Sequence, residues 1–191
     1  MSTTSKIQSI KALKAMGLNV PKLLLELHVK DDLEAWKKYY SEHDGRVSIR
    51  TEKGPSFKCP HHPNIKLNKA DREIHYLLSQ GYSIYVFEPI NPDKCLCRGN
   101  FLRKESGDCL VEWLEGPGTV RDLEKVPSHL INLVEFKGID KLLHYPNIYN
   151  VIKQLIPLGR FCNEIVEWSY YSEKVGTLKD YPIFWERRPW V

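Results

Sequence analysis

The stretch IVEWSYYSEKVGTLKDYPIFWERRPW, residues 165–190, reads as two β-strands rich in aromatic and β-branched side chains. Each strand carries charge where a buried strand should not: Glu167 in the first, Glu186 and Arg188 in the second. Because side chains alternate along a strand, Glu186 and Arg188 share one face. If the stretch pairs as a hairpin across a loop at 172–181, Glu167 can lie on that face too. The sequence therefore predicts two neighbouring carboxylates beside a guanidinium group.

Two interpretations of these charges are open. Two carboxylates side by side repel unless a cation lies between them, and oxygen ligands on neighbouring strands suit a magnesium ion that also holds phosphate oxygens. Arg188 would then face a phosphate group. Alternatively, the charges form a ladder of surface ion pairs with arginine or lysine across the hairpin. Spacing alone does not decide between them.

Composition places the chain among globular proteins. Its 191 residues are enough for one ordinary domain or two small lobes, and 42% of them are hydrophobic and 27% charged. No apolar run approaches the roughly 18 residues of a membrane span, and the N-terminal residues lack the order of a secretory signal, so we expect a cytoplasmic protein. The five cysteines fit reduced thiols. A net charge of +4 allows an anionic ligand such as a nucleotide but is small for a nucleic-acid-binding surface.

Periodicity and turn signals predict alternating helices and strands. Helices are expected at 5–16, 31–40, 68–80, from about 119–121, and at 146–158. Strands are expected at 23–27, 46–52, 82–90, 94–103, 107–116, 132–136 and in the closing hairpin, with a long loop at 53–67. This order favours an α+β fold of two small lobes with antiparallel sheets, 1–87 and 88–191. A ligand would by default bind between the lobes.

The closing hairpin resembles the end of the ATP-binding domain of phosphoenolpyruvate synthase and pyruvate phosphate dikinase, a branch of the ATP-grasp proteins. In that family a Glu-Trp strand is followed by a strand that ends Gln-x-Arg-Pro. The resemblance implies that Glu167 and Glu186 bind magnesium and that Arg188 binds a phosphate. Glu186 stands where the family has glutamine, and the added charge either tightens metal binding or indicates a different site.

The first part of the chain resembles the same family. KIQSIKALKAMGLNVP, residues 6–21, looks like the opening helix in which a lysine precedes a Gly-Leu-Pro-Val-Pro turn by eleven residues. The resemblance implies that Lys6 reaches the phosphates of ATP, although Thr4 and Ser5 replace the double glycine usual before that lysine. VSIRTEKG, residues 47–54, is similar to the strand end that supplies a second phosphate-binding cation, here Arg50.

Two further motifs follow in the family's order. YSIYVFEPI, residues 82–90, resembles the hinge strand, which implies that Glu88 and the backbone of Pro89 and Ile90 hold adenine. VEWLEGPGTVRDL, residues 111–123, is similar to the next strand and its glycine-rich turn. Gly116 and Gly118 could bring backbone N–H groups close to phosphates. Five such motifs imply an ATP-grasp-like fold that clamps a nucleotide between two lobes.

The function expected from this resemblance is ATP- and magnesium-dependent phosphoryl transfer or ligation. Arg188, Arg50 and Lys6 would be the catalytic cations, because phosphoryl transfer needs positive charge around the phosphates. The chain is much shorter than the family's ATP-binding domain, and we expect no complete pyruvate chemistry from it. The acceptor would be an unknown small molecule or protein. A phosphotransferase or ligase is one possibility, and nucleotide binding without turnover is another.

The alternative function is a non-catalytic interaction module, stabilised by zinc or binding nucleic acid. Cys59, His61 and His62, with Cys95 and Cys97, offer zinc ligands, but their spacings differ from those of zinc fingers. A proline-rich loop and two core thiols explain them more simply.

Aromatic side chains in the strands could in principle stack on bases. They are Trp113, Trp168, Trp185, Trp190, Tyr170 and Tyr171. Aromatic residues at strand positions are more often part of the core, and the residues between these are acidic, which disfavours RNA.

Overall fold

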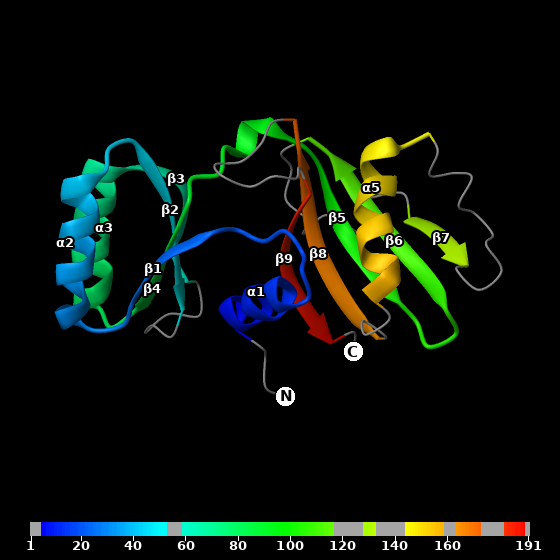
Figure 1. Cartoon of the computed structure of the whole chain (residues 1–191), viewed down its shortest axis with the longest axis horizontal. Helices are drawn as coiled ribbons and strands as arrows, with labels where there is room; N and C mark the ends of the chain where they lie inside the picture. Colours follow the sequence, from blue (N-terminus) through cyan, green and yellow to red (C-terminus); the bar gives the residue numbers. More distant parts are fainter. Residues whose placement is uncertain are drawn as a thin grey trace. The chain divides into compact units, whose positions relative to one another are not determined.

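The computed structural model of the chain describes residues 5–52, 59–116, 128–132, 144–158, 163–172 and 182–189, with backbone alone at 128–132 and 158. It is an α+β protein with two antiparallel sheets, as the sequence predicts (Figure 1). The chain divides into two compact units. Unit 1 is Met1–Val20, Asp93–Lys174 and Lys179–Val191, and unit 2 is Pro21–Pro92 with Val175–Leu178.

The first half of the chain contains these described elements: α1 (Lys6–Ala15), β1 (Leu23–Leu27), η1 (Lys30–Asp32), α2 (Leu33–Glu42), β2 (Arg46–Glu52), β3 (His61–Lys66), α3 (Leu67–Ser79) and β4 (Ser83–Phe87). The second half contains η2 (Pro92–Lys94), β5 (Cys95–Arg103), β6 (Asp108–Glu115), β7 (Ser128–Asn132), α5 (Pro146–Leu155), η4 (Ile156–Leu158), β8 (Glu164–Tyr171) and β9 (Pro182–Pro189). The helix expected from about 119–121 lies outside the described residues.

Unit 2 is a four-stranded sheet in the order β1-β4-β2-β3, covered on one face by α2 and α3 (Figure 1). Its core is an apolar cluster centred on Trp36, whose Nε1 donates to Asp71 Oδ1 on α3 at 2.8 Å. The prediction of a long loop at 53–67 is wrong for its second half, because residues 61–66 form the strand β3. Pro63 is tolerated there because β3 is an edge strand of the sheet.

Unit 1 is a five-stranded sheet in the order β7-β6-β5-β8-β9. Large apolar side chains, among them Phe101, Trp113 and Trp168, are buried in this sheet. Helix α5 packs on β8, and the Trp113 ring contacts Tyr145 just before the helix at a centroid distance of 5.0 Å. The core interpretation of the strand aromatics therefore holds for Trp113, Trp168 and Tyr171, all at most 4% exposed.

The first helix of the chain belongs to the unit of the second sheet. α1 packs on β9, the last strand, and buries Ile7, Ile10 and Leu13. The contacts divide the chain at 20/21 and 92/93. The division into lobes 1–87 and 88–191, expected from the sequence, stays a prediction.

Candidate functional site

Lys6 is placed beside β9 by the way α1 begins and packs. Ser5 forms a capping box with Gln8: the Ser5 Oγ accepts from the Gln8 backbone N at 3.2 Å, and the Gln8 Oε1 accepts from the Ser5 N at 3.4 Å. One turn further, the Ser9 Oγ donates to the backbone oxygen of Arg187 on β9 at 2.8 Å. These contacts fix the first turn of α1, and with it the position of Lys6, against the last strand.

The two glutamates singled out in the sequence are cross-strand partners. Glu167 on β8 lies opposite Glu186 on β9. The Lys6 Nζ lies 2.8 Å from the Glu186 Oε2 and 3.8 Å from the Glu167 Oε2. Both carboxylates are largely buried, with side chains 14% and 24% exposed. A cation therefore lies against the carboxylate pair, as like-charge repulsion requires, and it is an ammonium group from α1 rather than a residue across the hairpin.

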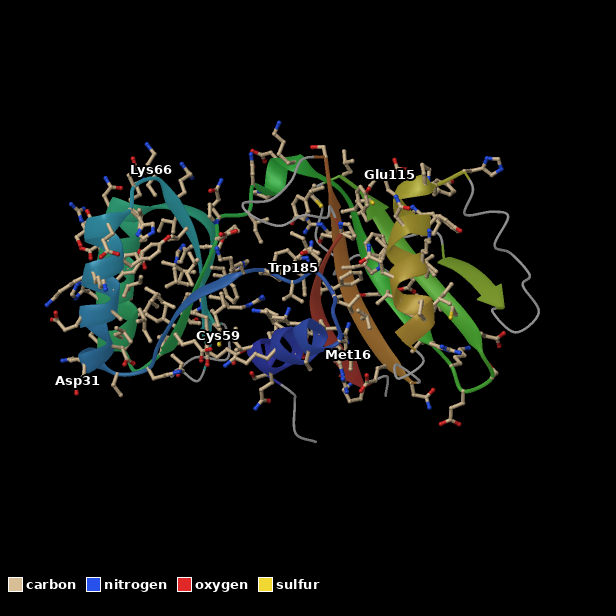
Figure 2. The ribbon with its side chains drawn as sticks, in the orientation of Figure 1. Met16, Asp31, Cys59, Lys66, Glu115 and Trp185 are labelled. Carbon is tan, nitrogen blue, oxygen red and sulfur yellow. The ribbon has the colours of Figure 1, made fainter. Side chains whose placement is uncertain are left out.

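A β-bulge at Trp185 creates this pairing. Trp168 pairs with Phe184 and Glu167 with Glu186, so Trp185 has no partner in the ladder. In a regular strand Phe184 and Glu186 would point to the same face. Because of the bulge, Phe184 points to the buried face of the sheet. Glu186 points to the same face as Glu167 and lies next to Lys6. Trp185, beside β9 in Figure 2, donates its Nε1 to the Ser169 Oγ at 3.0 Å.

The carboxylate pair continues as a polar row across four neighbouring strands. Asn100 on β5 is the register partner of both Glu167 on β8 and Glu112 on β6. Register partners point to the same face, so Glu112, Asn100, Glu167 and Glu186 form one row, called here the polar row. Asn100 is 5% exposed, and its buried Oδ1 has no hydrogen-bond partner among the residues that the structure describes. Glu112 is half-buried.

Sequence reasoning missed Asn100 and Glu112. Asn100 stands between Gly99 and Phe101 in CLCRGNFLR, and Glu112 stands between Val111 and Trp113 in DCLVEWLE. A polar residue at such a position is a signal in the sequence. Its role can be assigned only when the register between β5, β6 and β8 is known.

Arg188 lies next to this row and is exposed. It pairs with Ile165, two residues before Glu167, and so shares the face of the polar row. Its neighbour Arg187 is engaged elsewhere, with its Nη2 at 3.0 Å from the Glu164 Oε1. Gly116 follows β6 with a φ of +80°, a backbone conformation that suits glycine. Gly118 lies outside the described residues.

The remaining predicted residues belong to unit 2. Arg50 lies in the middle of β2, between His61 and Tyr85 in register. Glu88 directly follows β4, and its Oε1 lies 2.7 Å from the Lys22 Nζ. Ile90 donates its backbone N–H to the Ser48 Oγ at 3.3 Å. The roles of Arg50, Glu88, Pro89 and Ile90 in holding ATP stay predictions.

The described residues contain no group of three or more His, Cys, Asp or Glu side chains placed to hold a metal ion. Cys59 is exposed, whereas Cys95 and Cys97 are buried. Burial, with smaller contributions from Cys95 and Glu115, raises the pKa of the Cys97 thiol to about 12, so it is protonated at neutral pH. The two thiols of β5 therefore behave as core residues. None of the helices in the described part is long and apolar enough to cross a membrane.

The two antiparallel sheets and their helices have the α+β fold of the ATP-grasp proteins. One similar structure is N5-carboxyaminoimidazole synthetase from Staphylococcus aureus complexed with ADP, with a TM-score of 0.54 and 11% identity over 96% of this chain and 43% of that one. Another is the VanG D-Ala:D-Ser ligase from Enterococcus faecalis, with a TM-score of 0.51 and 15% identity over 97% of this chain and 52% of that one.

The chain thus spans about half the length of these two structures. No family model matches the sequence, and no curated protein does. The likeness shows the fold, and the narrower resemblance to phosphoenolpyruvate synthase and pyruvate phosphate dikinase stays a prediction.

Proposed function

We propose that this protein binds ATP together with magnesium and uses it for phosphoryl transfer or ligation to an acceptor. The observation that carries the proposal is the Glu167–Glu186 pair, with the Lys6 Nζ 3.8 Å from the Glu167 carboxylate and 2.8 Å from that of Glu186. The fold supports it, since the similar structures include a ligase and a synthetase complexed with ADP. The acceptor is a small molecule or another protein, and we expect the protein to act in the cytoplasm.

The residues at the pair fit a magnesium ion. Magnesium prefers oxygen ligands and is commonly held by one or two carboxylates together with nucleotide phosphates. Glu167 and Glu186 offer such carboxylates on neighbouring strands, and no described residue satisfies the buried Oδ1 of Asn100 beside Glu167. When bound, magnesium would neutralise the charge of the phosphates and orient them.

The chain's own cations complete the proposed site. Lys6 would exchange its contacts with the two glutamates for the phosphates, and Arg188, exposed beside the row, would bind them from the same unit. Arg50 is the further cation that the family resemblance implies for phosphate binding. Phosphoryl transfer depends mainly on positioning and on charge stabilisation of this kind.

The remaining proposed contacts hold the rest of the nucleotide. Glu88 and the backbone of Pro89 and Ile90 would hold adenine, as the family resemblance implies. Gly116 and Gly118 would bring backbone N–H groups to the phosphates.

Isothermal titration calorimetry of ATP with and without magnesium tests this proposal. The wild type should bind ATP more tightly with magnesium, and the variant Glu167→Ala/Arg188→Ala should lose the magnesium-dependent part while keeping its circular dichroism spectrum. A matched control is Glu34→Ala/Lys37→Ala, which removes an exposed ion pair with a 2.6 Å contact on α2 and should bind like the wild type. No binding to the wild type at millimolar ATP would refute the proposal.

Nucleotide binding without turnover is the second candidate. It is favoured by Thr4 and Ser5, which stand where the family has a double glycine before its lysine. Tight magnesium-dependent binding with no loss of ATP over hours, with or without candidate acceptors, would support it. A non-catalytic module stabilised by zinc would instead lose stability when treated with a chelator.

A further inference from the structure

Asn100 is the residue of the polar row whose environment is hardest to explain as structure alone. It lies in the middle of β5, next to the fully buried Phe101, and is itself 5% exposed. Within the described part of the chain, its buried Oδ1 has no hydrogen-bond partner. A buried acceptor with no donor costs free energy, and an apolar residue of the same size would avoid that cost.

The surroundings of Asn100 define what could satisfy this oxygen. Its register partners on either side are Glu112 and Glu167, so the groups nearest to it along the row are carboxylates. Carboxylates and an amide oxygen are all acceptors at neutral pH. A cation lying between these acceptors would satisfy the oxygen of Asn100.

We propose that Asn100 is the third protein oxygen ligand of the cation held by Glu167 and Glu186. This assignment rests on the proposed function and adds a ligand from β5, a strand to which the sequence motifs assign no metal ligand. Amide oxygens are ordinary ligands of magnesium and calcium. Side chains of directly opposite residues start about 4.5–5.5 Å apart at their Cβ atoms, so Asn100 and Glu167 can place oxygens on one ion.

The other end of the row explains why a ligand from β5 is needed. Arg188, two residues after Glu186, shares its face but offers no oxygen. Strand β9 therefore contributes one carboxylate. Lys6 lies closer to Glu186, at 2.8 Å, than to Glu167, at 3.8 Å, which puts the ammonium group toward the β9 side. Asn100 lies on the opposite side of Glu167, where a cation would meet Asn100 and Glu167 together.

The test measures Mg²⁺ binding by calorimetry in the presence of saturating AMP-PNP, a non-hydrolysable ATP analogue. Asn100→Leu should weaken Mg²⁺ binding at least tenfold and leave AMP-PNP binding in EDTA unchanged. Asn100→Asp, which keeps an oxygen in place and adds charge, should bind Mg²⁺ at least as tightly as the wild type. Glu115→Gln removes an exposed carboxylate from the end of β6 and serves as the control that should change nothing.

A second measurement uses the wild type alone. The side-chain amide NMR signals of Asn100, identified by their loss in Asn100→Leu, should shift when Mg²⁺ is added to the AMP-PNP complex. The amide of Asn64, whose Oδ1 already accepts from the Arg46 Nε at 2.8 Å, should not shift.

Wild-type Mg²⁺ affinity in Asn100→Leu, or Asn100 signals that do not respond to Mg²⁺, would overturn the assignment. If those results occur while Glu167→Ala/Arg188→Ala still abolishes magnesium-dependent binding, this assignment fails and the proposed function stands. If the wild type binds no AMP-PNP at millimolar concentration, both fail.

Discussion

At the scale of single residues, Asn100 should lower the free energy of unfolding of the protein while it helps to bind the cation. Replacing it by leucine removes a buried acceptor that no described residue satisfies, so Asn100→Leu should raise the free energy of unfolding by about 1–3 kcal/mol. Urea unfolding followed by circular dichroism measures this change. Asn100→Ala is the control, since it also removes the amide but leaves a cavity that offsets the gain. A less stable Asn100→Leu would mean that the amide is satisfied in solution.

Gly99, the neighbour of Asn100, is required by close packing. A Cβ at this position would lie 1.9 Å from the backbone oxygen of Glu112 and 2.7 Å from the Trp168 Cζ2. Gly99→Ala should therefore destabilise the protein by about 3 kcal/mol, the upper range for overpacking, because the backbone of β6 would have to move. Thermal unfolding gives the size of the effect.

The control for this prediction is Gly45→Ala. Gly45 has a φ of +96° and open space around it, so its cost should come from backbone strain alone and stay at about 1 kcal/mol. Equal effects of the two substitutions would contradict the packing argument.

Alternation along the strands predicted that Glu167 and Glu186 share a face, but one step of that reasoning was incomplete. Regular alternation would also have put the buried Phe184 on the face of Glu186. The bulge at Trp185 resolves the conflict, and a bulge has no reliable sequence signal. Asn100 and Glu112 could not be placed at all, because their meaning comes from the register between β5, β6 and β8, which is set by contacts far apart in the sequence.

At the scale of secondary-structure elements, the turn before α2 should make stability depend on pH. The Asp32 Oδ2 accepts the backbone N–H groups of His28 at 2.6 Å and Val29 at 3.0 Å. These hydrogen bonds lower the pKa of Asp32 below its ordinary value of 3.8. A carboxyl group whose pKa is lowered on folding binds fewer protons in the folded state, so its contribution is present above the ordinary pKa and is lost as the pH falls.

Asp32→Asn should therefore reduce stability at pH 7, and the difference from the wild type should shrink as the pH falls through the lowered pKa of the Asp32 carboxyl group. Denaturant midpoints of both proteins across this pH range check the prediction. Asp31→Asn, at the exposed neighbouring position, is the matched control. A constant difference between Asp32→Asn and the wild type at all pH values would contradict the role of the charge.

Most elements were predictable because their signals are local. The apolar spacing of α1 and the Gly17 that follows it, with a φ of +82°, gave that helix its correct place. The wrong prediction of a loop at β3 arose because this strand depends on a non-local contact. Its prolines indicated a loop, but pairing with β2 at the edge of the sheet makes 61–66 a strand, and such pairing is a tertiary contact that propensity does not report.

At the scale of the whole molecule, the contact between α1 and β9 joins the two ends of the chain. The Ser9 Oγ bonds to Arg187, and the Asn19 Nδ2 donates to the backbone oxygen of Pro182 at 2.8 Å. The sequence predicts α1 in an N-terminal lobe, 1–87, and that division into lobes stays a prediction. The contacts group α1 with the second sheet, and this puts Lys6 within 2.8 Å of Glu186.

This arrangement predicts how the whole protein responds to ligands. In the wild type the Lys6 ammonium compensates the Glu167–Glu186 pair, so Mg²⁺ alone should barely change the unfolding temperature, whereas Mg²⁺ with ATP should raise it. A ligand at 100 times its Kd adds about 2.7 kcal/mol to the free energy of unfolding. In Lys6→Met the pair lacks its counter-ion, so Mg²⁺ alone should bind and raise the unfolding temperature.

Thermal unfolding of the wild type and Lys6→Met, each with Mg²⁺, ATP, both or neither, measures the effect. Lys14→Met removes a lysine from the other end of α1 and should respond to each condition like the wild type. If Mg²⁺ alone stabilises the wild type as much as Lys6→Met, Lys6 does not compete with the metal. If Lys6→Met gains nothing from Mg²⁺ while wild-type binding still requires both ligands, the metal is held by the nucleotide rather than by the carboxylate pair.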